Sequence, residues 1–324
     1  MSHLDDTSGP DTLGQQTSAN LSDGQEYVPR VETHLVASQY VKQTFKVQVF
    51  RPARKRDETT RFPVVYATDG NLTFDLFRGI AYLLQSSEQS ECRFILASIG
   101  YPDDSPTAGV VLRARDLTFP GYPQLKIPTP TSGGALAVER GTKDYFGAED
   151  FQLFIAEELI PLLDRSYETI PGDRTYFGHS AGAGFGLFTL FARTHLFKNF
   201  IISSPGLIYD GTSSAGINYE NYDFLLQHAR EFVASGKSLD GVTVYMSVGA
   251  EEEFEAGLEQ WHLTSGFYRM IALMKAAAIP GLVLLTEVFS DETHATAWPI
   301  AFMHGVQAVF GTGVWKQKNP RRSV

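Results

Sequence analysis

The chain has 324 residues, a length that allows one large domain or two of ordinary size. Hydrophobic residues make up 43% and charged residues 20%, a balance typical of a folded globular protein and unlike that of a disordered chain. The formal net charge of -10 repels phosphate groups, so no nucleic-acid partner is expected. The single cysteine, Cys92, excludes an intrachain disulfide and a zinc site made of several thiolates.

Both ends of the chain are polar and are expected to form tails. Residues 1–26 are rich in Ser, Asp, Gly, Thr and Gln and lack the apolar run of a signal peptide, which predicts a cytoplasmic location. Residues 316–324 are also polar, and we assign residues 27–315 to a single folded domain. No stretch approaches the roughly 20 apolar residues of a membrane span, so no span is expected.

Short apolar runs along this domain predict β-strands. The second run alternates polar and apolar residues and is followed by a proline, and only polar residues come between the neighbouring runs. This pattern predicts that the first two strands form an antiparallel edge of a sheet. The later runs are almost continuously apolar, as in parallel strands that are buried on both faces. In chain order the predicted strands are residues 34–37, 44–50, 62–67, 93–99, 175–178, 200–203, 242–248 and 282–289.

Segments with helical spacing of apolar residues fall between the strands. This alternation predicts an α/β fold with a mostly parallel central sheet and helices on both faces. The segment 101–147 breaks the alternation with several prolines, and loops of that length usually serve as lids or binding loops over a site. The predicted helices are residues 148–167, 182–193, 222–234, 254–278 and 295–310.

Residues 178–182 read Gly-His-Ser-Ala-Gly and lie between a predicted strand and a predicted helix. In a nucleophile elbow of the pattern G-x-S-x-G, the serine sits on a turn so tight that both outer positions are glycine. The turn would place Ser180 at a helix N-terminus, where main-chain N–H groups face a developing oxyanion. We therefore predict that Ser180 is a nucleophile, the alternative being a glycine-rich turn whose serine has no chemical role.

A serine nucleophile needs a base, and the chain has 8 histidines. In this architecture the nucleophile, the acid and the histidine follow one another along the chain on loops after successive strands. His294 lies after the last predicted strand and before the last predicted helix, which makes it the predicted base. His304 falls within that helix, and His179 adjoins the serine with its side chain directed away.

The predicted acid lies on the loop after strand 242–248, where three consecutive carboxylates stand. One of them would fix the tautomer of the imidazole and stabilise the imidazolium. An acidic run at this place also suits a solvated helix start. Position alone does not separate Glu251, Glu252 and Glu253, and Asp291 on the histidine loop competes with them, although it better suits a helix cap.

With these residues the chain resembles the Putative esterase family of α/β-hydrolases, which includes esterase D-like enzymes, mycolyltransferases and siderophore esterases. The similarity covers most of the chain, from residue 30 to residue 312, and two of its runs, Arg-x-Arg-Asp-Leu-Thr and Glu-Glu-Leu-Ile-Pro, are most similar to the siderophore esterases. Phe119 stands where that subgroup commonly has proline. The motifs that carry the resemblance are residues 65–71, 99–101, 113–118, 157–161 and 178–182, together with His294, Trp298 and Pro299.

The resemblance implies a role for individual residues. It implies Ser180 as the nucleophile, His294 as the base and the main-chain N–H groups of Asn71 and Ala181 as the oxyanion hole. The family's acid usually stands three residues after the glycine that ends its strand, which is Glu252 here. Some siderophore esterases resemble Ser-His dyads, so the acid is the least determined member.

The predicted activity is hydrolysis of a carboxylic ester through an acyl-enzyme, on a siderophore-like or another small-molecule ester. An acyltransferase or a thioesterase would use the same residues. A non-catalytic binding protein on this scaffold would be expected to have lost one of the three groups, and none is lost. No cofactor or metal is expected, because the sequence lacks a phosphate loop, a dinucleotide fingerprint and a histidine cluster with metal-ligand spacing.

Two arginines in the long segment are candidates for substrate binding. Arg113 and Arg115 could hold a carboxylate or a polar acyl group through paired hydrogen bonds. Ordinary salt bridges are the alternative for both. The oligomeric state is not predicted.

Overall fold

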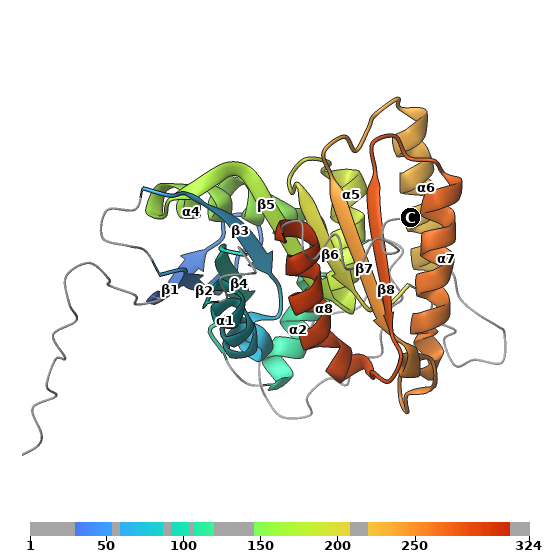
Figure 1. Cartoon of the computed structure of the whole chain (residues 1–324), viewed down its shortest axis with the longest axis horizontal. Helices are drawn as coiled ribbons and strands as arrows, with labels where there is room; N and C mark the ends of the chain where they lie inside the picture. Colours follow the sequence, from blue (N-terminus) through green and yellow to red (C-terminus); the bar gives the residue numbers. More distant parts are fainter. Residues whose placement is uncertain are drawn as a thin grey trace, which may run out of the picture.

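The computed structural model describes residues 30–53, 59–86, 92–103, 106–119, 146–207 and 220–311. Its centre is an 8-stranded sheet in the order β1-β2-β4-β3-β5-β6-β7-β8 (Figure 1). Strand β2 runs antiparallel to both of its neighbours, β1 and β4, and all neighbouring pairs from β4 to β8 are parallel, in agreement with the predicted parallel sheet with an antiparallel edge. The strands are Arg30–Ala37 (β1), Thr44–Arg51 (β2), Phe62–Ala67 (β3), Ile95–Gly100 (β4), Thr169–His179 (β5), Asn199–Ser203 (β6), Thr243–Gly249 (β7) and Val283–Phe289 (β8).

Helices cover both faces of the sheet. In Figure 1, α1 and α8 lie together in front of the strands, and rings of the two helices stack there, with the centroids of Phe77 and Phe302 4.0 Å apart. The helices α5, α6 and α7 pack on one another along the opposite face. The α-helices are Gly70–Ser86 (α1), Pro106–Asp116 (α2), Ala148–Leu153 (α3), Ile160–Ser166 (α4), Ala181–Ala192 (α5), Glu220–Ala234 (α6), Leu263–Ala276 (α7) and His294–Phe310 (α8).

The helix predicted over residues 148–167 is continuous but not uniform. It consists of α3, a π-helical segment at Phe154–Leu159 and α4. Pro161 stands at the start of α4, where its missing N–H and its ring oppose regular α-helical bonding to the preceding turn. The wider π-helical turn comes directly before it and replaces the regular helical turn that the proline opposes.

Three expectations about helices are wrong. The segment 101–147 is not a loop throughout, because α2 occupies residues 106–116, and residues 120–145 lie outside the described part. Helix α1 was not predicted at all. The helix expected from residue 254 begins only at Leu263, after two short 3-10 turns, because Gly257 and His262 adopt positive φ angles of 85° and 44° that interrupt a helix.

The predicted tails, residues 1–26 and 316–324, lie outside the described residues. Among the helices that are described, none is both long enough and apolar enough to cross a membrane.

Candidate active site

The candidate residues gather at the carboxyl ends of the parallel strands. Ser180 follows β5, the acidic run follows β7, and His294 follows β8. The ends of the central strands are level, since His179 pairs with Ser203 of β6, which in turn pairs with Ser247 of β7. Crevices at the carboxyl ends of parallel strands are the usual ligand sites of open α/β sheets.

Ser180 lies on a sharp turn between β5 and α5. Its φ of 58° and ψ of -118° are rarely adopted by residues other than glycine, and such strain is common at catalytic positions. A side chain at Gly178 would lie 2.3 Å from the carbonyl oxygen of Gly182, and one at Gly182 would lie 2.6 Å from Thr68 Oγ1. Both glycines of the motif are therefore needed, because Gly178 lies close to the main chain of Gly182 and Gly182 lies close to the turn at Thr68. A nucleophile elbow has this same requirement.

His294 is the first residue of α8, and two carboxylates hold it. Its Nδ1 lies 2.7 Å from Oε2 of Glu252, whose side chain is fully buried. Its main-chain N–H donates to Glu255 Oε2 at 2.6 Å, so a carboxylate also faces the N-terminus of this helix. The imidazole is fixed at Nδ1, which leaves Nε2 as the nitrogen available for proton transfer.

The structure separates the four carboxylates that the sequence left open. Glu252 is the one that contacts His294, and its Oε1 accepts hydrogen bonds from Ser204 Oγ at 2.6 Å and from the main-chain N–H of Gly249 at 2.7 Å. Glu253 instead accepts from the main chain and hydroxyl of Ser265, at the start of α7. Glu251 and Asp291 are exposed, and the cap of α8 is Thr293 rather than Asp291.

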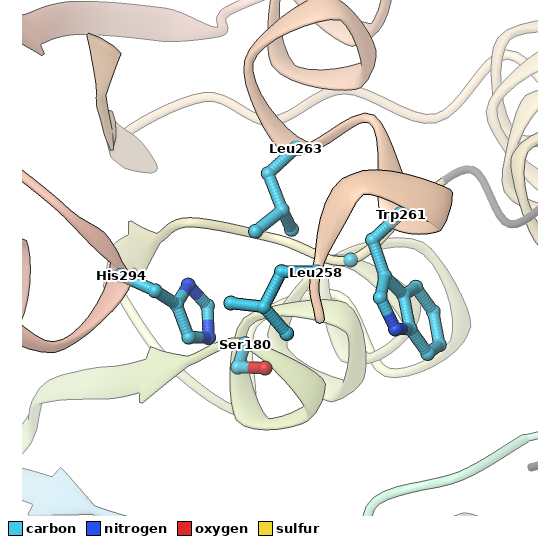
Figure 2. A pocket seen from close by; sticks show the side chains of 6 residues that line it. Ser180, Leu258, Trp261, Leu263 and His294 are labelled. Carbon is cyan, nitrogen blue, oxygen red and sulfur yellow. The ribbon is translucent and has the colours of Figure 1, made fainter. Parts of the chain in front are cut away.

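Ser180 and His294 line one small cavity, of about 30 Å³. Figure 2 shows the imidazole beside Ser180 and the indole of Trp261 across the cavity from His294. No hydrogen bond joins Ser180 Oγ to the imidazole within the described residues, and such bonds often form only in the complex with substrate. The remaining lining is Gly206, Leu258 and Leu263.

The wall of this cavity was not predicted from the sequence. It comes from the segment between β7 and α7, whereas the expected lid, the segment 101–147, contributes no described residue to it. The available signal was a tryptophan, Trp261, in an irregular stretch that follows the candidate acid. Aromatic side chains in such positions often form binding surfaces.

Asn71 lies at the second residue of α1, directly after the turn that follows β3. Its side chain pairs with the main chain of Tyr101, donating to the carbonyl at 2.8 Å and accepting from the N–H at 2.6 Å. Tyr101 in turn donates to Asp116 at 3.0 Å, and burial together with that carboxylate raises the pKa of the phenol. The backbone at Asn71 is thus tied to the end of β4.

Arg113 and Arg115 both contact buried carboxylates. Arg113 binds Asp69, and Arg115 binds both carboxylate oxygens of its neighbour Asp116 at 2.6 and 3.0 Å. The side chains of the two aspartates are 3% and 0% exposed. The structure therefore favours the salt-bridge alternative for both arginines, with the difference that these pairs are internal rather than at the surface.

The imidazole of His294 packs against a stack of two rings, those of His179 and Trp298, which the sequence did not predict. His179 is buried, its ring lies parallel to that of Trp298 with centroids 4.3 Å apart, and its other neighbour is His294 at 4.3 Å. Its Nδ1 lies 2.9 Å from Ser203 Oγ. Burial, with a smaller contribution from His294, holds the pKa of His179 well below its usual value, so this ring stays neutral.

The family model described as "Putative esterase" matches residues 130–290, a span that contains the elbow and the acidic run. Over this span, just under half of the chain, the sequence is similar to that esterase family of α/β-hydrolases. It is 24% identical over 277 residues to the ferri-bacillibactin esterase BesA of Bacillus subtilis, covering 84% of this chain and 87% of the relative. The family-model match and the esterase relatives support carboxylic ester hydrolase activity, the reaction class that the sequence predicts.

Another curated relative is a siderophore enterobactin esterase of Emericella nidulans, 27% identical over 194 residues, which are 59% of this chain and 58% of the relative. Solved structures share the fold. The siderophore hydrolase EstA of Aspergillus nidulans superposes with a TM-score of 0.67 at 21% identity, over 86% of this chain and 93% of its own. The BES protein of Bacillus cereus gives 0.67 at 20% identity, over 93% and 100%.

Proposed function

We propose that the chain is a serine esterase in which Ser180, His294 and Glu252 form a catalytic triad. The observation that carries the proposal is the 2.7 Å contact between His294 Nδ1 and the buried Glu252, with His294 and Ser180 lining the same cavity. A carboxylate on Nδ1 fixes the tautomer in which Nε2 accepts a proton. The positive φ of Ser180 supports its assignment as the nucleophile.

In the proposed reaction, Ser180 Oγ attacks the ester carbonyl while His294 takes the hydroxyl proton, and Glu252 stabilises the imidazolium. The imidazolium then gives its proton to the leaving alcohol, and an acyl ester on Ser180 remains. Water, deprotonated by the same imidazole, attacks that ester and releases the acid. Each proton that His294 accepts is returned within the cycle.

The negative oxygen of each tetrahedral intermediate needs hydrogen-bond donors that are already in place. We assign this role to the main-chain N–H groups of Asn71 and Ala181. Each lies in the first turn of a helix, α1 and α5 respectively, and main-chain N–H groups at a helix N-terminus favour a bound anion. The positive ends of two helix dipoles would then face the developing charge.

For the substrate we propose a siderophore ester, by analogy with the relatives named as ferri-bacillibactin, enterobactin and triacetylfusarinine C esterases. The apolar wall of Leu258, Trp261 and Leu263 supports a group with an apolar or aromatic face next to the scissile ester. The proposed substrate is therefore a small-molecule ester.

A turnover panel tests the proposal. The wild-type protein should hydrolyse p-nitrophenyl esters and release acid and alcohol fragments from at least one of the three named siderophores, detected by liquid chromatography. Ser180→Ala and His294→Ala should each lower turnover by several powers of ten while the protein remains folded. Turnover of thioesters alone, with all oxygen esters untouched, would contradict the proposed function.

A further inference from the structure

Arg113 contacts both segments that carry the proposed oxyanion donors. Its Nε and one terminal nitrogen donate to the two carboxylate oxygens of Asp69 at 2.5 and 3.3 Å. The same terminal nitrogen, Nη2, donates to the main-chain carbonyl oxygen of His179 at 3.1 Å. One guanidinium of α2 thus joins the turn after β3 to the elbow after β5.

The two contacts lie at equivalent places. Asp69 precedes Asn71 by two residues, and His179 precedes Ala181 by two residues. Asp69 has a φ of 62°, so the backbone on this side is as unusual as that of the elbow at Ser180. Two short strained segments, each ending at one proposed N–H donor, therefore meet at a single cation.

The two segments also pack closely on each other. The main-chain N–H of Thr68 donates to the carbonyl of Phe177 at 3.3 Å, where β3 meets β5. A side chain at Gly182 would meet Thr68 Oγ1 at 2.6 Å and Asp69 Oδ2 at 3.5 Å. No side chain separates the turn from the start of α5, so the position of Asp69 directly affects the distance between the two donors.

The contact differs from an ordinary surface salt bridge. The side chain of Asp69 is only 3% exposed, and loss of Arg113 would leave its buried charge with the hydroxyl of Thr68 at 3.4 Å as its remaining side-chain donor among the described contacts. The planar fork of arginine can bind a carboxylate and a carbonyl together, whereas the ammonium of lysine is a point charge. Both residue types keep the charge, but only arginine fixes the angle between the two segments.

We infer that Arg113 is a positioning residue that fixes the separation of the Asn71 and Ala181 N–H groups in the proposed oxyanion hole. The inference rests on the proposed function. Donors to an oxyanion must lie about 2.7–3.1 Å from it, and a misplacement of about 1 Å costs on the order of 100-fold in rate. Arg113 does not touch the substrate in this assignment, so its loss affects the chemical step more than binding.

The test compares Arg113→Gln and Arg113→Lys with a matched control, Arg174→Gln. Arg174 pairs with Asp164 at 3.1 Å, and its side chain is 21% exposed against 24% for Arg113. It lies at the middle of β5, the strand that leads to the elbow. The control therefore loses an ion pair whose arginine is similarly exposed, although its partner Asp164 is 28% exposed against 3% for Asp69.

The measurement is the pre-steady-state acylation rate with p-nitrophenyl acetate across a range of concentrations, at a temperature well below every variant's Tm. We expect Arg113→Gln to acylate about 10- to 100-fold more slowly with an apparent ester affinity within about threefold of the wild type. Its affinity for a boronic acid, which mimics the tetrahedral intermediate, should fall by the same factor as the rate. Arg113→Lys should recover only part of the rate, and Arg174→Gln should stay within about twofold of the wild type.

Acylation of Arg113→Gln within twofold of Arg174→Gln would overturn the inference, as would a loss confined to ester affinity. If the glutamine variant does not fold, the lysine variant decides, because full recovery by lysine would show that charge alone suffices. A wild-type protein that is not acylated at Ser180 would instead overturn the proposed function together with this inference. Acylated wild type with unaffected Arg113 variants overturns the inference alone.

Discussion

The candidate site has two sides that are held in different ways. On the proton-transfer side, Glu252 and His294 lie on the loops after β7 and β8, and their side chains bind each other directly. On the proposed oxyanion side, the turn at Asp69–Asn71 and the elbow at His179–Ala181 would present main-chain N–H groups, and Arg113 contacts both segments. The function of the first side depends on the identity of its side chains. The function of the second side depends on the position of its main-chain groups.

Because of this difference, we expect the two sides to respond differently to substitution. A group that changes charge in the reaction cannot be replaced without loss of the chemistry, so effects on the proton-transfer side should be large. A group that only fixes backbone position should cause smaller, graded effects. The predictions that follow test this contrast from the largest expected effect to the smallest.

Glu252→Gln should show the largest effect among residues that do not react with substrate. The substitution keeps the shape of the side chain but removes the charge that stabilises the imidazolium, so turnover should fall about 10⁴-fold. Glu251→Gln and Asp291→Asn serve as controls, because both side chains are exposed and neither contacts His294, and each should lose less than about tenfold. Steady-state ester hydrolysis measures all three.

If Glu252→Gln also stays within tenfold, the site is a Ser180–His294 dyad and the triad is wrong. Collapse of activity in Asp291→Asn alone would move the acid to the histidine loop.

Ser204→Ala should give an intermediate effect. This buried serine has a positive φ of 50° and donates to Glu252 Oε1 at 2.6 Å, so it holds the acid without contact to the cavity. Its loss leaves the Gly249 N–H on the same oxygen, and kcat should fall about tenfold with KM unchanged, as expected for a hydrogen bond to a charged group. The control is Ser247→Ala on the neighbouring strand, whose buried hydroxyl has no hydrogen-bond partner among the described residues.

An equal loss of kcat in Ser204→Ala and Ser247→Ala would show that both act only through packing. A change in KM without a change in kcat would contradict the role given to Ser204.

His179 should affect stability through its protonation. Burial lowers its pKa in the folded protein, whereas in the unfolded chain it titrates near the ordinary value of about 6.5. Below that pH the unfolded chain binds a proton that the folded state excludes, so the free energy of unfolding falls by up to about 1.4 kcal/mol per pH unit. Above it, His179 contributes no pH dependence.

Urea unfolding of the wild type and His179→Gln between pH 5 and pH 8 measures this effect. The variant should lose this part of the acid dependence, and the exposed control His195→Asn should keep it. Parallel curves for wild type and His179→Gln would mean that folding does not lower the pKa of His179.

The sequence predicts one side of the site better than the other. Ser180 and His294 were predicted because the chemistry requires a particular residue type after a particular strand, and Glu252 was selected among its neighbours only by the spacing that the resemblance implies. The contacts of Arg113 were not predicted, because its two partners stand 44 and 66 positions away along the chain. One of these partners is also a main-chain carbonyl, which any residue could supply. The same holds for Ser204 and for the ring stack on His179, which require knowledge of strand register.

The strands were predicted well because their apolar runs are short and almost continuous. Helix α1 was missed for a physical reason: Leu72, Leu76 and Leu83 are exposed, and these extra apolar positions obscure the spacing of its buried face. Helix α2 begins with Pro106, and proline at the first turn of a helix is favourable, although prolines in that segment suggested a loop.

The most direct test of the account is covalent labelling of Ser180. A fluorophosphonate reacts with an activated serine, so the wild-type protein should gain one phosphonyl group, lose esterase activity in proportion, and carry the added mass on the peptide that contains residues 178–182. Ser180→Ala should remain unlabelled under the same conditions. Full esterase activity in a protein without label on that peptide would contradict the assignment of Ser180 as the nucleophile.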